Sequence, residues 1–107
     1  MTGDQAAVTD HRELASRMVA VLAEMTTHLD AALPVDVQIA TWRGVIHLVL
    51  MSPATKQDAE NLADRLNLAQ HKSYPYAARR QIQHTWFDHV AGIPAEVTWI
   101  DHLPGDD

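Results

Sequence analysis

Residues 35–51, VDVQIATWRGVIHLVLM, decide the fold that this sequence predicts. Apolar and polar side chains alternate over residues 35–42, an Arg43-Gly44 pair follows, and residues 45–51 form a second, almost wholly apolar run. Two such runs on either side of a glycine turn are typical of a β-hairpin. We therefore expect two antiparallel strands near the middle of the chain.

The second run of this hairpin is apolar on both faces. Because side chains alternate along a strand, Ile46, Leu48 and Leu50 are expected to point one way. The residues that point the other way are Val45, His47, Val49 and Met51. A strand with two apolar faces is typical of the middle of a sheet, with its second face covered either by this chain or by a partner.

A helix is expected on each side of the hairpin. The first, over residues 10–34, opens with an aspartate and a glutamate at capping-box spacing and carries a wide apolar stripe. The second, over residues 52–68, opens at Ser52-Pro53, with Ser52 as the N-cap, and carries a narrower stripe. A narrow stripe indicates a helix that lies on the surface of a sheet.

The remaining chain predicts a loop and a second hairpin. Residues 71–78 show no hydrophobic period and are interpreted as a loop, while residues 81–91 and 95–102 are expected to be strands joined across residues 92–94. The fold class predicted is α+β, a two-layer sandwich of order α-β-β-α-β-β, in which an antiparallel sheet carries two helices on one face.

Length and composition indicate one domain. The 107 residues, of which 47% are hydrophobic, suit a single domain over 1–107, with 1–9 and 104–107 expected to be flexible. The absence of cysteine excludes disulfides and thiolate metal sites. Without a secretory signal or an apolar stretch of spanning length, the expected location is the cytoplasm, with no membrane partner.

The charge of the chain is unevenly distributed. A net charge of −6 disfavours a general affinity for nucleic acid, because Lys and Arg drive binding to phosphates. Residues 71–80 nevertheless lack an acid and combine aromatic with basic side chains: Lys72, Tyr74, Tyr76, Arg79 and Arg80. Such a segment would suit an acidic peptide, a phosphate or single-stranded nucleic acid. The alternative is a connector whose tyrosines cover the edge of the sheet and whose arginines pair with the acidic tail, residues 104–107.

Motifs for specific chemistry are absent from the sequence. Its four glycines make no phosphate-binding loop, and it contains neither a His-Glu-x-x-His pair nor a Gly-x-Ser-x-Gly turn, so no cofactor is expected. The best cluster is His84, Asp88 and His102 on the second hairpin, since imidazole and carboxylate groups bind zinc or share a proton. With residues 92–94 as the loop, His84 falls opposite His102, whereas a slip of one residue separates them.

The functional expectation is a non-enzymatic binding or regulatory module that acts through protein–protein contacts, as a homodimer joined through the sheet. Two sets of residues are expected to supply the contacts: Trp42, Val45, Val49 and Met51, and Tyr74, Tyr76, Arg79 and Arg80. A competing arrangement folds the second hairpin over the first set, with Trp86, Trp99 and Phe87 as its core partners.

Two other functions stay open. One is a small metal-binding or acid–base enzyme site on the second hairpin, with the histidines and the aspartate named above. The other is a binder of a small apolar ligand, in a pocket between the sheet and the first helix. The residues expected to line that pocket are Met18, Met25, Trp42 and Met51. Methionine side chains adapt to ligands, but they also fill irregular cores.

Overall fold

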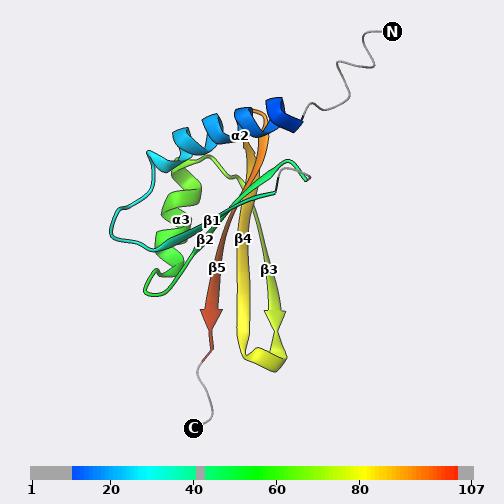
Figure 1. The fold of residues 1–107 in the computed structure, drawn as a ribbon. Coiled ribbons are helices and arrows are strands. Elements are labelled where there is room, and N and C mark those ends of the chain that lie inside the picture. The colour runs from blue at the N-terminus through cyan, green and yellow to red at the C-terminus, as the bar shows by residue number, and fades with distance from the viewer. Residues whose placement is uncertain (1–10, 41–42, 104–107) are drawn as a thin grey trace.

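A computed structural model of the chain describes residues 11–40 and 43–103. Over these residues it is an α+β fold with two α-helices, a short 3₁₀ helix and five strands, which confirms the expected class (Figure 1). The elements in chain order are α2 (His11–Thr26), β1 (Val35–Ala40), β2 (Val45–Leu50), α3 (Lys56–Arg65), β3 (Gln70–Tyr76), η1 (Ala77–Arg79), β4 (Gln81–Val90) and β5 (Ile93–His102).

The strands form one mixed sheet in the order β1-β2-β5-β4-β3. The β1–β2 hairpin is antiparallel as expected, and so are the β4–β5 and β3–β4 pairs. The prediction of an antiparallel sheet is wrong at the centre, where β2 and β5 run parallel. Parallel strands need a long crossover connection, and here the crossover contains α3, β3 and β4.

The segment that was interpreted as a loop contains strand β3. It pairs with β4 from Gln70, opposite Phe87, to Tyr76, opposite Gln81. Every residue of β3 is exposed, because the strand lies at the edge of the sheet and has a neighbour on one side only. An edge strand with no buried side chain needs no hydrophobic period, and it tolerates Pro75.

The turn between β4 and β5 differs from the expected one. It consists of Ala91 and Gly92, whose φ angles of 51° and 81° are those of a two-residue type I′ turn. The expected loop over residues 92–94 is therefore wrong, and Ile93 already pairs with Val90. Pro94 is tolerated inside β5 because β2 pairs with β5 only from Ala95 onward.

Helix α3 begins later than the sequence indicated. Its N-cap is Thr55, not Ser52, and a capping box joins Thr55 to Asp58: the Asp58 N–H donates to Thr55 Oγ1 at 3.2 Å, and the Thr55 N–H donates to Asp58 Oδ2 at 2.8 Å. Ser52 precedes a cis peptide bond to Pro53, in a turn after β2. Two reciprocal hydrogen bonds satisfy more of the first-turn N–H groups than a lone serine does.

The core lies on one face of the sheet. Alternate side chains of β2 are buried there as predicted, with Ile46 and Leu48 fully buried and Leu50 3% exposed. Both helices cover this face, since α2, which ends at Thr26 rather than near residue 34, contributes the fully buried Met18 and Met25, and α3 contributes a short apolar stripe. Burying one such side chain contributes roughly 1.5–3 kcal/mol. In the part of the chain that is described, no helix has the length and apolar character to cross a membrane.

Candidate functional site

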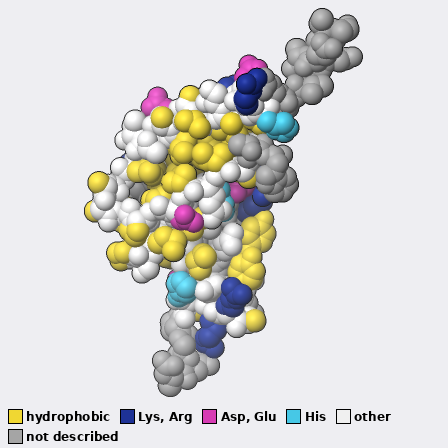
Figure 2. All heavy atoms as spheres, in the orientation of Figure 1, with side chains coloured by type: hydrophobic (Ala, Val, Ile, Leu, Met, Phe, Trp, Pro, Cys, Tyr) yellow, Lys and Arg dark blue, Asp and Glu magenta, His cyan; other side chains and the backbone are white. Residues whose placement is uncertain are grey.

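No helix of residues 11–40 or 43–103 covers the other face of the sheet, which is called the open face here. Figure 2 looks onto it, and hydrophobic side chains lie along the β3 edge above Lys and Arg side chains at the foot of the sheet. Strand alternation and the pairing register place these side chains on the open face: Asp36, Gln38, Val45, His47, Val49, Glu96, Thr98, Ile100, Gln83, Thr85, Phe87, Lys72, Tyr74 and Tyr76.

The open face contains residues of both sets that were expected to bind a partner. The sequence alone does not show that the two sets share a surface. Val45 and Val49 project from β2, and Tyr74 and Tyr76 project from β3 on the far side of β5 and β4. Met51 follows β2 and is 48% exposed. The fourth member of the first set, Trp42, lies outside the described residues.

The second hairpin does not fold over this face. It continues the sheet instead, because β5 pairs with β2 and β4 pairs with β5. Trp86 and Trp99 lie on the helix-covered face, where Trp86 is buried and Trp99 packs against the core. Phe87 points to the open face. The arrangement with all three as core partners of the first set is therefore wrong.

Charged groups stand at both ends of one row across the open face. The pairing register aligns Asp36 of β1, Val49 of β2, Thr98 of β5, Thr85 of β4 and Lys72 of β3. The row thus begins with a carboxylate at one edge of the sheet and ends with an ammonium group at the other. The centre of the row consists of Thr98 and Thr85, whose short side chains project less from the sheet than those at its ends.

A line of hydrogen bonds crosses the centre of the face. His47 Nε2 lies 2.7 Å from Thr98 Oγ1, which lies 3.1 Å from Thr85 Oγ1, and Thr98 and Thr85 are 3% and 4% exposed. A histidine that activates a hydroxyl needs its carboxylate on the other ring nitrogen. Glu96 Oε1 instead approaches the same Nε2, at 4.0 Å. The geometry is that of a structural network which satisfies two buried hydroxyl groups.

Lys72 lies beside two aromatic rings of the open face, those of Phe87 and Tyr74. Its Nζ is 4.7 Å from the centroid of the Phe87 ring and 5.5 Å from that of the Tyr74 ring, within the range of cation–π contacts. A hydrogen bond with the Tyr74 side chain, followed by its charge and that of Glu96, raises the pKa of Lys72 above its ordinary value. The positive charge at this edge therefore persists through neutral pH.

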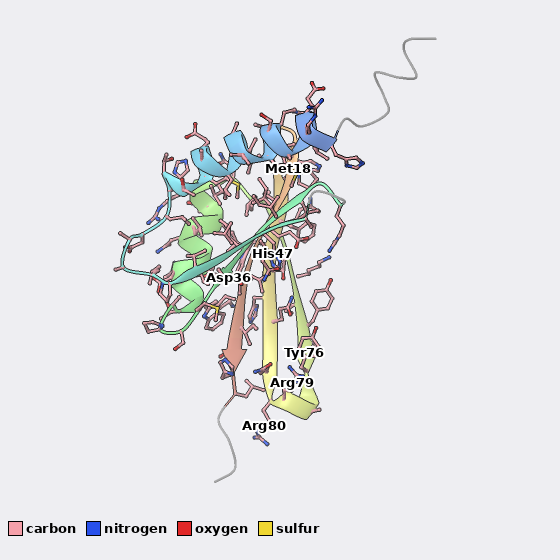
Figure 3. All side chains as sticks on the ribbon, viewed as in Figure 1. Met18, Asp36, His47, Tyr76, Arg79 and Arg80 are labelled. Atoms are coloured by element: carbon pink, nitrogen blue, oxygen red, sulfur yellow. The ribbon has the colours of Figure 1, made fainter. Side chains whose placement is uncertain are left out.

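The foot of the face is formed by the turn from β3 to β4. Arg80 takes a positive φ of 52°, and its carbonyl accepts the Leu103 N–H at 2.8 Å, so the turn is tied to the end of β5. Figure 3 shows Tyr76, Arg79 and Arg80 gathered at this foot. The structure thus places the basic and the aromatic residues of the second set next to each other.

The cluster expected on the second hairpin is not assembled. His84 pairs with Trp99 and points to the helix-covered face, whereas His102 pairs with Gln81 and points to the open face. The short Ala91-Gly92 turn moves the register and places the two histidines on opposite sides of the sheet. Among residues 11–40 and 43–103, no group of three or more His, Cys, Asp or Glu side chains is arranged to hold a metal ion.

Asp88, the third member of that cluster, has a local structural role. The backbone N–H groups of His89 and Ala69 donate to its carboxylate at 2.9 and 3.2 Å. These two hydrogen bonds, that of His89 first, hold the pKa of Asp88 below its ordinary value. The carboxylate thereby fixes the segment that leads into β3.

A histidine pair that the sequence did not reveal lies on the helix-covered face. His71 Nε2 and His84 Nδ1 are 3.2 Å apart with nearly parallel rings, so one nitrogen donates to the other. The pair is flanked by Trp86 and Trp99, at 4.8 Å from His71 and 5.8 Å from His84 respectively. Burial, followed by the charges of Lys56 and His71, lowers the pKa of His84. A loop over residues 71–78 predicts no such pair, because only the pairing of β3 with β4 places His71 beside His84.

The residues expected to line an apolar ligand pocket are divided between two surfaces. Met18 and Met25 have no exposed surface and fill the core beneath α2. Met51 borders a hollow at the end of β2, next to Val49 and Ile100. The methionines of the core and of the open face therefore do not line a common cavity.

No family model, no curated protein and no solved structure matches this chain.

Proposed function

We propose that this chain is a non-enzymatic binding module that works as a homodimer, with two copies packed through their open faces. The observation that carries the proposal is the helix-free face itself. Among its exposed apolar side chains, Tyr74 is 42% and Tyr76 49% exposed on β3, and Met51, at the end of β2, is 48% exposed. Exposed apolar and aromatic side chains on one surface are typical of interfaces.

The row from Asp36 to Lys72 supports a particular symmetry. A two-fold axis in the interface, parallel to the strands and above β5, brings β3 of one copy over β1 of the other. Lys72 of each copy then faces Asp36 of the second copy, because both lie in the same row of the sheet. Such an interface is self-complementary, as two-fold dimers require.

The middle of the row suits the packing of two sheets. Thr98 and Thr85 are short and have their hydroxyl groups satisfied within the sheet. They leave room for two sheets to approach to the usual spacing of about 10 Å, in the aligned arrangement that twisted sheets adopt. A regulatory role in the cytoplasm is part of the proposal.

Light scattering after size exclusion, at two protein concentrations, tests the dimer. We expect a mass of two copies at the higher concentration, and a melting temperature that rises with concentration because folding and association are linked. Val49→Glu places a carboxylate in the middle of the face and should give a single-copy mass. The matched control is Val19→Glu, at a 57% exposed position of α2 away from the open face, which should leave the dimer intact.

Two results would contradict the proposal. One is the mass of one copy at both concentrations for the unmodified chain. The other is a dimer that survives Val49→Glu as well as it survives Val19→Glu, which would move the contact to an edge of the sheet.

A further inference from the structure

The foot of the open face contains a hollow of about 350 Å³. Its lining residues are Tyr76, Arg79, Gln81, Gln83 and Ile100. The hollow lies beyond the end of the β1–β2 hairpin, since β2 pairs with β5 no further than Trp99. The hollow is formed by residues of one copy and shares Tyr76 with the surface of the proposed dimer, so the inference requires no second copy and does not rest on the proposed dimer.

The cation of the hollow is Arg79. Its guanidinium group makes no ion pair with a residue in the described ranges, and no carboxylate of these ranges is among the lining side chains. A planar guanidinium group binds phosphate or carboxylate through two parallel hydrogen bonds. In a chain with a net charge of −6, this corner is therefore one that suits an anionic group.

Two side-chain amides form the floor of the hollow. Gln81 and Gln83 point to the same side of β4, and their Nε2 atoms make only long contacts, at 3.3 Å with His102 Nδ1 and 3.4 Å with Thr85 Oγ1. Neither amide oxygen accepts a hydrogen bond within the described part of the chain. A primary amide presents a donor beside an acceptor, the pattern that pairs with N6 and N7 of adenine.

An aromatic ring and an aliphatic side chain complete the hollow. Tyr76 stands directly opposite Gln81, and its ring has no stacking partner in the ranges that the structure describes. Ile100, which pairs with Gln83, adds an apolar surface beside the amides. Exposed tyrosine rings on a sheet are stacking surfaces for planar bases, whatever the base.

We infer that this hollow binds a nucleotide, with the base against Tyr76, the edge of the base on the amides of Gln81 and Gln83, and the phosphate on Arg79. The base and the phosphate of a nucleotide thus each have matching groups in the lining. A free mononucleotide and one nucleotide of a single strand share this chemistry. The negative charge of the whole chain repels a polyanion, so we expect the free mononucleotide to bind at least as well as the same nucleotide in a strand.

The inference is tested by titrating the ¹⁵N-labelled full chain and following its amide resonances by NMR. The probes are AMP, adenosine, inorganic phosphate and a single-stranded oligoadenylate, each to about 5 mM nucleotide or phosphate, where a binding free energy of only about −3 to −4 kcal/mol is detectable. We expect AMP to shift the side-chain amides of Gln81 and Gln83 saturably, and adenosine and phosphate to bind more weakly. Similar affinity per nucleotide for AMP and the oligoadenylate identifies the free nucleotide as the ligand, and tighter binding of the oligoadenylate identifies the strand.

Variants identify the groups that carry the binding. Arg79→Ala removes a charge-assisted contact and should weaken AMP binding about tenfold or more. Gln83→Glu keeps the shape of the side chain but places a negative charge beside the base. It should weaken the binding of AMP to a similar degree. The matched control is Arg17→Ala on α2, which removes an arginine far from the hollow and should bind AMP as the unmodified chain does.

Several results would overturn the inference. The first is the absence of saturable shifts with both AMP and the oligoadenylate. Another is phosphate alone reproducing the affinity of AMP, since the hollow would then select an anion and not a nucleotide. A third is binding of a short acidic peptide in preference to AMP. An unchanged affinity in both Arg79→Ala and Gln83→Glu would place the nucleotide elsewhere.

Discussion

The two faces of this sheet are made by alternate residues of the same strands, yet they differ in what they contribute. On the helix-covered face, Ile46, Leu48 and Val97 have no exposed surface. On the open face, their neighbours Val45 and Val49 are only half-buried, and the centre is a line of hydroxyl groups. One face therefore holds the chain together, while the other leaves its apolar side chains available to a partner.

The largest expected difference between the faces is in the cost of truncating adjacent residues. Leu48→Ala opens a cavity in the core and should lower the free energy of unfolding by about 2–5 kcal/mol. Val49→Ala, one position along the same strand, should lower the free energy of unfolding of the single copy by less than about 1 kcal/mol. Urea denaturation at a concentration too low for association measures both. Equal losses would mean that the open face is also a core.

A smaller effect is expected from the buried hydroxyl groups of the open face. Thr98→Val removes the hydrogen-bond partner of the Thr85 hydroxyl and should cost about 1–3 kcal/mol, because a buried hydroxyl group loses its partner. Replacing both threonines with valine removes the unsatisfied group and should cost less than the two single changes together. A double-mutant cycle in urea measures this coupling, and additive losses would contradict the hydrogen-bonded pair.

The smallest expected effect is a pH dependence that arises on the helix-covered face. Burial and the neighbouring Lys56 and His71 lower the pKa of His84 in the folded chain, against the opposing charges of Asp101 and Glu60. The unfolded chain therefore takes up a proton first as the pH falls. The stability that His84 contributes is fully present above its unfolded pKa of about 6.5 and is lost as the pH falls toward the folded value.

Denaturation in urea between about pH 7.5 and 5.5 measures this slope. His84→Gln removes the titrating group and should flatten the fall in stability over that range. A slope that is identical in the variant and the unmodified chain would assign the pH dependence to other residues. Tryptophan fluorescence is a suitable probe because Trp86 and Trp99 lie beside the ring of His84.

The parts of the fold that local sequence determines were predictable. The β1–β2 hairpin follows from the local alternation of apolar and polar residues. The same alternation indicates that Ile46, Leu48 and Leu50 point to one face of the sheet. Strand β3 was missed because an edge strand with only exposed side chains carries no hydrophobic period. The parallel pairing of β2 with β5 joins segments about fifty positions apart, and no local pattern encodes it.

The candidate surface was predictable residue by residue but not as a surface. Val49 and Tyr74 were singled out for their types, and only the strand order shows that they share a face. The histidine cluster failed because a two-residue turn at Ala91-Gly92 replaced the expected loop and moved the register. The sequence does not indicate a binding role for Gln81 and Gln83, since two glutamines at alternate positions are common in an exposed strand.

The strand order also has a consequence for how the chain acquires its structure. The sheet consists of a β1–β2 hairpin and a β3–β4 hairpin, and these are joined only through β5, the last of the described strands along the chain. During synthesis on the ribosome, neither hairpin can complete the sheet until the segment of β5 has emerged. Long-range pairing of this kind slows folding. We therefore expect the nascent chain to expose the apolar faces of both hairpins until its central strand is inserted, and to depend during that interval on the chaperones that protect unfinished chains.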